Sequence, residues 1–130
     1  MMKKKRRVSN GCPGFKIERF FRPCLLLLLA HEPSHGYELL EEIRKTWFQN
    51  EMCDGGLVYR SLRRMEEEGL VRSEWTMGSS GPAKRVYYIT EKGHAALRSW
   101  VVHIQSQLKR FEAFLRKYEE LLSEKRGKTP

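Results

Sequence analysis

The stretch LVYRSLRRMEEEGLV, residues 57–71, predicts an amphipathic helix whose charges run against the usual preference. Val58, Leu62 and Met65 recur at spacings of four and three, which places them on one buried stripe. A helix carries partial positive charge at its N-terminus, so its own stability favours acids early and bases late. Here the bases come first, and the acids close the last turn: Arg60, Arg63 and Arg64, then Glu66, Glu67 and Glu68.

Two explanations of this reversed order remain open at the level of sequence. The arginines can pair locally with glutamates one turn later, Arg63 with Glu67 and Arg64 with Glu68. Such pairs contribute only about 0.2–0.5 kcal/mol, and less when the base precedes the acid. The alternative is a polyanionic partner, because guanidinium groups match phosphates and guanine edges with paired hydrogen bonds.

The residues around this helix define its ends and a following hairpin. Asp54 is a candidate N-cap, and Gly69 stands where a left-handed residue ends a helix, with Leu70 folding back after it. LVRSEWTM then alternates, which predicts a half-buried strand with Val71, Ser73, Trp75 and Met77 on one face and Arg72, Glu74 and Thr76 on the other. A turn-rich GSSGPA loop leads to a second strand, KRVYYIT.

Two more helices are expected upstream. Residues 15–31, FKIERFFRPCLLLLLAH, are strongly apolar, and Pro23 suits the first turn of a helix that continues through the leucines. Five consecutive leucines require burial on most of the helix circumference. Ser34 is a suitable N-cap for a second helix, in which Tyr37, Leu40, Ile43 or Arg44, and Trp47 recur at helical spacing.

The C-terminal third predicts one long helix, from Thr90 as N-cap to about Glu124. Its apolar residues alternate steps of four and three without a miss: Leu97, Val101, Ile104, Leu108, Phe111, Leu115, Tyr118 and Leu122. Trp100, Phe114 and Leu121 widen this seam on one side. So broad an apolar stripe exceeds what a core of this size can cover, and we expect a partner chain to cover it.

The order of three helices, a hairpin and a long helix predicts an α+β, mainly helical fold: a winged helix-turn-helix with a two-stranded wing. We expect a flexible basic arm over residues 1–14 and the DNA-binding domain over 15–91. A dimerisation helix would occupy 92–124, and a disordered tail 125–130.

Charge is distributed unevenly along the 130 residues, whose net charge is +9. Residues 1–22 hold eight bases and one acid, 23–91 eight bases and eleven acids, and 92–130 nine bases and four acids. This distribution favours a polyanionic partner. The basic start has a second explanation as a solubilising or vector-derived segment.

The sequence also indicates a cellular compartment. The longest uninterrupted apolar run, Cys24 to Ala30, is far shorter than the roughly 20 residues of a membrane span. Arg19 and Arg22 fall where a secretory signal would be apolar, and the cysteines show no C-x-x-C pair. We expect a cytoplasmic chain that binds no membrane.

Catalytic and metal-binding motifs are not evident. There is no G-x-S-x-G, no Walker-type glycine loop and no spaced carboxylate pair, so an enzyme is not expected, nor any cofactor. Pro33 separates His31 from His35, which disfavours a shared metal site. Cys24 is predicted to be a core residue, and Cys53 is a candidate redox-sensitive thiol. Four aromatics could line a pocket between the winged domain and the last helix, or belong to the core: Trp47, Trp75, Trp100 and Phe111.

Three segments in order resemble the PadR family of transcriptional regulators: LLLLLAHEPSHGYELLEEI, GLVYRSLRRMEEEGLVRSEW and GPAKRVYYITEKG. The resemblance covers residues 21 to about 100, and FFRPCLLLLL and SGPAKRVYYIT look most like the polyhydroxybutyrate-responsive repressor branch. It implies a winged-helix repressor that dimerises through its C-terminal helix. Such a repressor binds a pseudo-palindromic operator in double-stranded DNA and is released by a small-molecule effector or a stress signal.

The resemblance also implies which residues meet DNA. Tyr59 and Arg60 would begin the recognition helix, which continues through Arg63 and Arg64. The start of the second helix would lie near phosphates, with Ser34, His35 and Tyr37, and the wing would contribute Lys84 and Arg85. In the family a Thr or Ser usually stands where this chain has Leu57, so capping of the helix falls to Asp54. The competing interpretation is a protein-interaction module that uses the C-terminal helix and has no specific DNA site.

Overall fold

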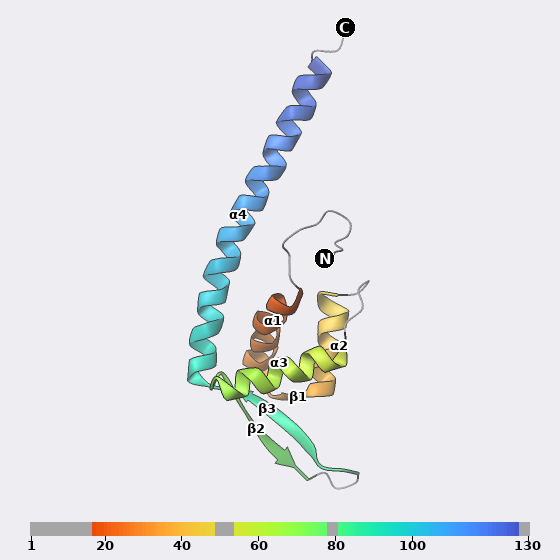
Figure 1. Cartoon of the computed structure of the whole chain (residues 1–130), viewed down its shortest axis with the longest axis vertical. Coiled ribbons are helices and arrows are strands. Elements are labelled where there is room, and N and C mark those ends of the chain that lie inside the picture. The colour runs from red at the N-terminus through yellow and green to blue at the C-terminus, as the bar shows by residue number, and fades with distance from the viewer. Residues whose placement is uncertain (1–16, 49–53, 78–80, 128–130) are drawn as a thin grey trace, which may run out of the picture.

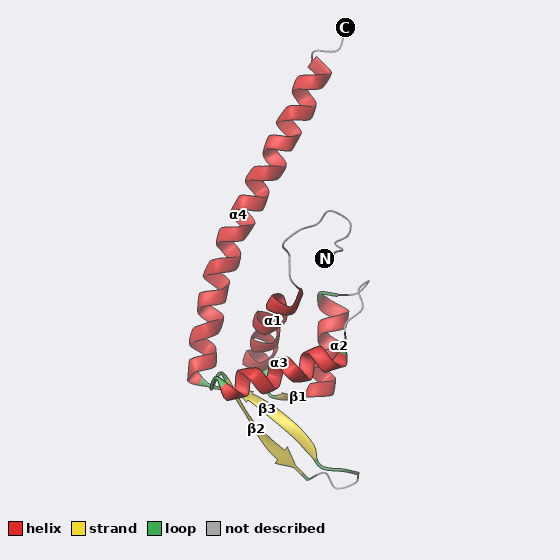
Figure 2. Cartoon of the chain, viewed as in Figure 1, coloured by secondary structure: helices red, strands yellow, loops and turns green. Residues whose placement is uncertain are grey.

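The computed structural model describes residues 17–48, 54–77 and 81–127, so the predicted arm over 1–14 lies outside the described residues. Figures 1 and 2 show a compact group of helices, a small sheet beside it, and one long helix that leaves the group. The elements are α1 Ile17–His31, β1 Ser34–His35, α2 Gly36–Thr46, α3 Gly55–Glu67, β2 Val71–Thr76, β3 Lys84–Ile89 and α4 Glu91–Gly127. The predicted winged helix-turn-helix order is confirmed.

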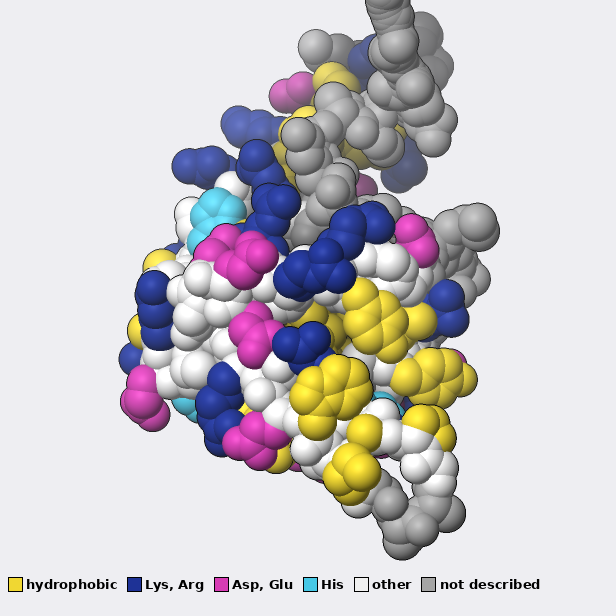
Figure 3. Space-filling model, turned by 60° about the horizontal axis from the view of Figure 1, so that its bottom comes forward, with side chains coloured by type: hydrophobic (Ala, Val, Ile, Leu, Met, Phe, Trp, Pro, Cys, Tyr) yellow, Lys and Arg dark blue, Asp and Glu magenta, His cyan; other side chains and the backbone are white. Residues whose placement is uncertain are grey.

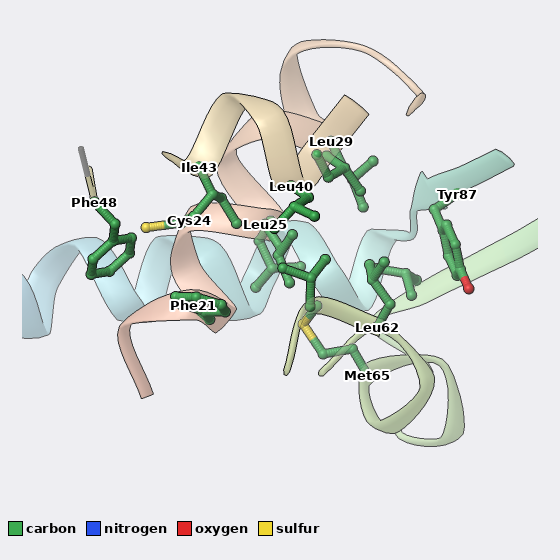
Figure 4. Packing of buried hydrophobic residues seen from close by; sticks show 14 residues of the cluster. Phe21, Cys24, Leu25, Leu29, Leu40, Ile43, Phe48, Leu62, Met65 and Tyr87 are labelled. Carbon is green, nitrogen blue, oxygen red and sulfur yellow. The ribbon is translucent and has the colours of Figure 1, made fainter. Parts of the chain in front are cut away.

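The core lies where α1, α2, α3 and β3 meet. Figure 4 shows side chains of these elements pointing toward one another, among them Phe21, Ile43, Leu62 and Tyr87. The predicted stripe of α3 is fully buried, with Val58, Leu62 and Met65 at 0 % exposure. Burying each such side chain contributes about 1.5–3 kcal/mol, so the stripe fixes α3 against the other two helices.

Pro23 lies inside α1 and not in its first turn, which corrects the expected helix start. A proline within a helix removes one backbone hydrogen bond and costs about 3 kcal/mol. The turn before it holds Phe21, which is fully buried and packs on Phe48 with ring centroids 5.2 Å apart. This burial offsets the lost hydrogen bond, and the helix extends back to Ile17.

The sheet has three strands in the order β1-β3-β2, one more than the sequence predicts. Ser34 and His35 form β1 and pair antiparallel with Tyr87 and Val86. Ser34 is therefore a strand residue, and His35 is the N-cap of α2, with its backbone N–H 3.4 Å from a carboxylate oxygen of Glu38. A strand of two residues has no periodicity that a sequence pattern can reveal.

The hairpin of β2 and β3 is half-buried only near its base. Val71 is buried, but Trp75 is 65 % exposed and Met77 is 85 % exposed, so the predicted buried face does not extend along the strand. Figure 1 shows why: the hairpin projects beyond the helices, and its outer half has no core to cover it. We call this hairpin the wing.

One junction ties α3, β2 and α4 together. Gly69 ends α3 with a φ of 82°, and the Leu70 N–H donates to the Met65 carbonyl at 2.9 Å, as the sequence predicts for a left-handed C-cap. The Thr90 hydroxyl donates to the Gly69 carbonyl at 2.7 Å and accepts from the Gly93 N–H at 3.0 Å, which confirms Thr90 as the cap of α4. A Cβ at Gly93 would overlap the Leu70 carbonyl oxygen.

Beyond this junction, α4 continues as a helix to Gly127, three residues past the predicted end. Leu97 and Trp100 pack against the core. The seam residues from Val101 to Tyr118 are exposed, from 38 % for Ile104 to 59 % for Leu115, and Leu122 is half-buried. The four aromatics do not meet in one pocket, because Trp75 lies on the wing and Phe111 on the exposed part of α4.

The close approach at Gly93 generates a stability prediction. Gly93→Ala should force α4 away from the Leu70 carbonyl and lower the free energy of unfolding by about 1–3 kcal/mol, as overpacked sites do. Gly127→Ala is the matched control, because a Cβ there meets no described atom within 4 Å. Thermal melts should show a lower Tm for the first variant and an unchanged or higher Tm for the second. Equal melting of the two variants would contradict this description of the junction.

Cys24 is buried, which confirms that it is a core residue. Its burial also generates a prediction about the reactivity of its thiol. The Cys24 side chain is 2 % exposed, and burial raises the pKa of its thiol to about 12. The thiolate is the reactive form, so at pH 8 the folded chain should keep this thiol protonated and unreactive. In the Cys12→Ser, Cys53→Ser background, iodoacetamide should label Cys24 only after denaturation. Rapid labelling of the folded protein would show that the thiol is accessible.

Candidate nucleic-acid interface

Two contacts fix the start of α3: the Asp54 side chain caps the helix, and the Tyr59 ring packs against the backbone of Gly36. The Asp54 carboxylate accepts a hydrogen bond from the Gly56 N–H at 2.9 Å, so the predicted cap is confirmed in a chain with leucine at position 57. The Tyr59 ring lies directly against Gly36, where any Cβ would overlap it. This contact places the first residue of α2 beside the first turns of α3.

The arginines of α3 face away from the core. Arg60, Arg63 and Arg64 are exposed, and among the described residues none of them forms an ion pair. The acids of the last turn have other partners: Glu68 pairs with Arg22 of α1, and Glu66 with Arg85 of the wing. The local Arg–Glu pairs considered from the sequence are therefore absent from the described part of the chain.

A hollow of about 480 Å³ lies between the start of α2, the outer face of α3 and the wing. We call it the α3–wing hollow. Its lining consists of His35, Gly36, Tyr37, Tyr59, Arg63, Glu66, Trp75, Lys84, Arg85 and Tyr87. Figure 3 shows the face of the molecule that carries the wing, where hydrophobic side chains gather next to basic ones.

The hollow brings together six of the nine predicted DNA-binding residues: His35, Tyr37, Tyr59, Arg63, Lys84 and Arg85. The other three lie elsewhere. Arg60 reaches back over the start of α3, where a Cβ on Gly56 would meet its Nη1 at 3.0 Å, and Arg64 is exposed in the last turn. The Ser34 hydroxyl is 3.5 Å from the Glu32 carbonyl and lines a separate hollow between α1 and α2.

Sequence reasoning missed three side chains of the lining. The sequence predicts Trp75 on one face of a half-buried strand and Glu66 at the acidic end of α3, and it assigns no face to Tyr87. Burial raises the pKa of the Tyr87 hydroxyl, and Tyr87 is 5 % exposed at the floor of the hollow. Near the rim, a hydrogen bond with Glu41 raises the pKa of the Tyr37 hydroxyl. The alternation of β3 could have predicted that Arg85 and Tyr87 share a face.

Lys84 and Arg85 are not equivalent, although they are neighbours on the wing. Consecutive strand residues point to opposite faces, and Arg85 shares a face with its cross-strand partner Trp75. The Arg85 Nε donates to the Ser73 hydroxyl at 2.9 Å, and its guanidinium lies 5.7 Å from the Trp75 ring centroid. Arg85 is thus folded against the protein surface, whereas Lys84 has no ion pair within the described ranges.

The described residues hold neither a metal site nor a membrane-spanning helix. No group of three or more His, Cys, Asp and Glu side chains there could hold a metal ion. None of the described helices combines the length and apolar character that a membrane span needs. Cys53, the candidate redox-sensitive thiol, lies outside the described residues.

The fold and the exposed basic helix beside a wing define a winged helix-turn-helix protein. The model of the family described as "Transcriptional regulator PadR-like family" matches residues 25–99, more than half of the chain. The chain therefore belongs to the PadR-like family, as the sequence motifs predict. The family is described as one of transcriptional regulators.

Individual relatives agree with this assignment. A probable transcriptional regulator of Mycobacterium tuberculosis is 31 % identical over 77 residues, which is 59 % of this chain and 41 % of the relative. The transcriptional regulator YqjI of Escherichia coli K12 is 27 % identical over 108 residues, 79 % of this chain and 48 % of the relative. The chain thus spans less than half the length of these curated relatives.

A solved structure, a putative transcriptional regulator from Thermoplasma acidophilum, has a similar fold. Its TM-score is 0.68 at 28 % sequence identity, and the match covers 77 % of this chain and 94 % of that one.

The exposed arginines generate a prediction that separates fold from binding. Replacing Arg60 and Arg63 with Gln should leave the fold intact, because both side chains are exposed and neither forms an ion pair among the described residues. Affinity for an operator selected from a random duplex library should fall, by about 1–3 kcal/mol for each arginine that contacts a base. Melts and titrations of the same variant measure both effects. A variant that melts much lower yet binds as before would make these arginines structural.

Proposed function

We propose that the chain is a homodimeric repressor that binds a pseudo-palindromic operator in double-stranded DNA, in the cytoplasm. The observation that carries this proposal is the row of exposed arginines on α3, which lies next to the wing and has no acidic partner among the described residues. A Bacillus subtilis PadR, similar in fold with a TM-score of 0.59 at 21 % identity, has been solved in complex with operator DNA. That match covers 65 % of this chain and 48 % of that one.

In this proposal α3 enters the major groove with its N-terminal turns leading. Arg60 and Tyr59 lie in these turns, and Arg63 follows one turn later on the side of the hollow. A guanidinium can donate two parallel hydrogen bonds to guanine, which is the commonest specific contact in the major groove. Phosphates and guanine edges around these cations would add electrostatic attraction to the hydrogen bonds.

The α3–wing hollow would receive the DNA backbone between the two grooves that α3 and the wing contact. Its rim carries the start of α2, where His35 and Tyr37 are available to phosphate oxygens. Backbone N–H groups at a helix start favour anions, which adds to this attraction. Lys84 at the opposite rim would supply phosphate affinity without reading sequence. Arg64, one turn from Arg60, would add a contact on the outer side, and Ser34 lies just before α2.

A second copy of the chain would cover the apolar seam of α4. Outside the winged domain this helix exposes large apolar side chains at heptad spacing, including Leu108 at 52 % and Phe111 at 55 %. A surface of this kind on an isolated chain is costly in water, and packing on a symmetry mate removes it. The proposed interface uses Leu97, Val101, Ile104, Leu108, Phe111, Leu115, Tyr118 and Leu122. Two-fold symmetry would in turn require an operator with two inverted half-sites.

A finer assignment concerns the signal that releases the DNA. We propose release by a small-molecule effector or a stress signal. A more specific proposal is membership of the polyhydroxybutyrate-responsive branch, in which the polymer is the signal, and its support is the pair of segments FFRPCLLLLL and SGPAKRVYYIT. If this assignment holds, purified protein should sediment with polymer granules and lose its operator in their presence. Retention of the operator at saturating polymer would exclude this branch.

An interaction module without a specific DNA site is the second candidate, favoured only by the exposed seam of α4. Salt dependence separates the two. Phosphate contacts give an affinity that falls steeply as salt rises, by about 0.9 log units per contact for each tenfold in salt. A protein adaptor would show no shift of a duplex at any salt concentration.

The seam of α4 generates a prediction about assembly. Leu108→Glu should shift the protein from dimer to monomer, because the charge would be buried against its symmetry mate. Ser106→Glu is the matched control: it adds the same charge to the same helix on the side opposite the seam. Sedimentation at micromolar concentration should give a monomer for the first variant and a dimer for the second. A wild-type chain that sediments as a monomer would disprove the proposed dimer.

A further inference from the structure

A closed ring of hydrogen bonds joins α3 to both strands of the wing. The Ser73 hydroxyl donates to Glu66 Oε2 at 2.8 Å and accepts from Arg85 Nε at 2.9 Å. The Arg85 Nη2 lies 3.4 Å from Glu66 Oε1, which closes the ring. We call these three residues the clasp. Among the described residues it is the set of side-chain hydrogen bonds that joins α3 to the wing.

The register of the sheet explains why these residues meet. Ser73 pairs across the ladder with Tyr87, and Trp75 pairs with Arg85, so all four side chains share the face of the wing that looks toward α3. Glu66 lies three residues after Arg63 on the side of α3 that lines the hollow. The Arg85 guanidinium is flanked by both rings, 5.7 Å from Trp75 and 5.8 Å from Tyr87.

An acid in the α3–wing hollow opposes the proposed binding of DNA, so its presence there calls for another role. Glu66 lies in the hollow that would receive the phosphates, and its charge repels them. Its side chain is 30 % exposed, and that of Arg85 is 46 % exposed, so the pair is only partly screened by water. Glu67, the next residue, is exposed and takes part in no ion pair of the described residues.

We propose that Glu66 is a positioning residue for DNA binding: through Ser73 and Arg85 it sets the angle of the wing against α3. The inference rests on the proposed function. In it, Arg85 holds the wing in place, and Lys84 is the wing residue that contacts phosphate. Lys84 and Arg85, which the family resemblance implies as two DNA contacts of the wing, thus have different roles. The wing then meets the DNA backbone at a fixed distance from the arginines of α3.

The direction of the change in affinity tests this role. Glu66→Ala removes a negative charge from the face toward DNA, and if Glu66 were only a surface acid, operator affinity would rise. A positioning role predicts a loss of about three- to tenfold, comparable to one hydrogen bond. Glu67→Ala is the matched control and should raise affinity. If Glu66→Ala lowers the Tm markedly, Glu66→Gln replaces it, since the amide keeps the shape of the side chain. An increase in affinity on loss of Glu66 would overturn the inference.

Exchanging the charges of Glu66 and Arg85 should restore operator binding that each single change weakens. Glu66→Arg and Arg85→Glu should each weaken operator binding, and the double variant should recover at least half of the loss on the logarithmic scale. The Ser73 hydroxyl can both donate and accept, so it can bridge the swapped pair as it bridges the native one. Losses that simply add in the double variant would show that the two residues act independently.

A second readout needs no DNA. Backbone amides of β2 and β3 should exchange faster with deuterium in Glu66→Ala than in wild type or in Glu67→Ala, because the wing is no longer held to α3. Unchanged exchange would overturn the clasp. If the wild-type chain bound no duplex at any salt concentration, the proposed function would fail, and this exchange measurement would still decide whether Glu66 holds the wing.

Discussion

The close approach of Gly93 to the Leu70 carbonyl is the constraint on which the rest of the structure depends. At this point the end of α3, the start of β2 and the first turn of α4 meet within hydrogen-bonding distance. The Lys92 ammonium adds a fourth link by donating to the Glu68 carbonyl at 2.9 Å. These bonds satisfy carbonyl groups that the end of a helix leaves open, and they do so with the start of another helix. The direction of α4 is thereby tied to that of α3.

This coupling matters because the two helices have different proposed partners. If α4 packs on a second copy and α3 enters DNA, the junction sets the distance between the two recognition helices of the dimer. Inverted half-sites one helical turn apart require about 34–36 Å between those helices. A rotation of α4 about the junction changes that spacing without touching any DNA contact. An effector that alters α4 packing could therefore release DNA from a distance, and the residue with least freedom at the pivot is Gly93.

The sequence was informative wherever a feature depends on neighbours along the chain. The buried stripe of α3, its Asp54 cap, its Gly69 end and the Thr90 cap of α4 all follow from spacing and residue type, and each is confirmed. The family motifs were equally local.

The features that escaped prediction are those set by contacts between distant segments. The two-residue β1 exists because β3 passes beside it, and Pro23 is tolerated because Phe21 fills the core. Trp75 is exposed because the wing projects beyond the helices. The contact of Glu66 with Arg85 joins residues nineteen positions apart, and only the register of the hairpin brings them together.

The reversed charge order of α3 now divides into two halves with separate causes. Acids at the negative end of a helix are unfavourable, yet two of them anchor α3 to the rest of the molecule, Glu68 to Arg22 of α1 and Glu66 to the wing. Both acids pair with arginines of other elements, so the arginines of α3 do not pair with the acids of their own helix and remain exposed. An order with the bases last would move the cations away from the start of α2 and toward the junction with α4. The unfavourable interaction of the acids with the helix dipole is thus a consequence of where the helix is fixed.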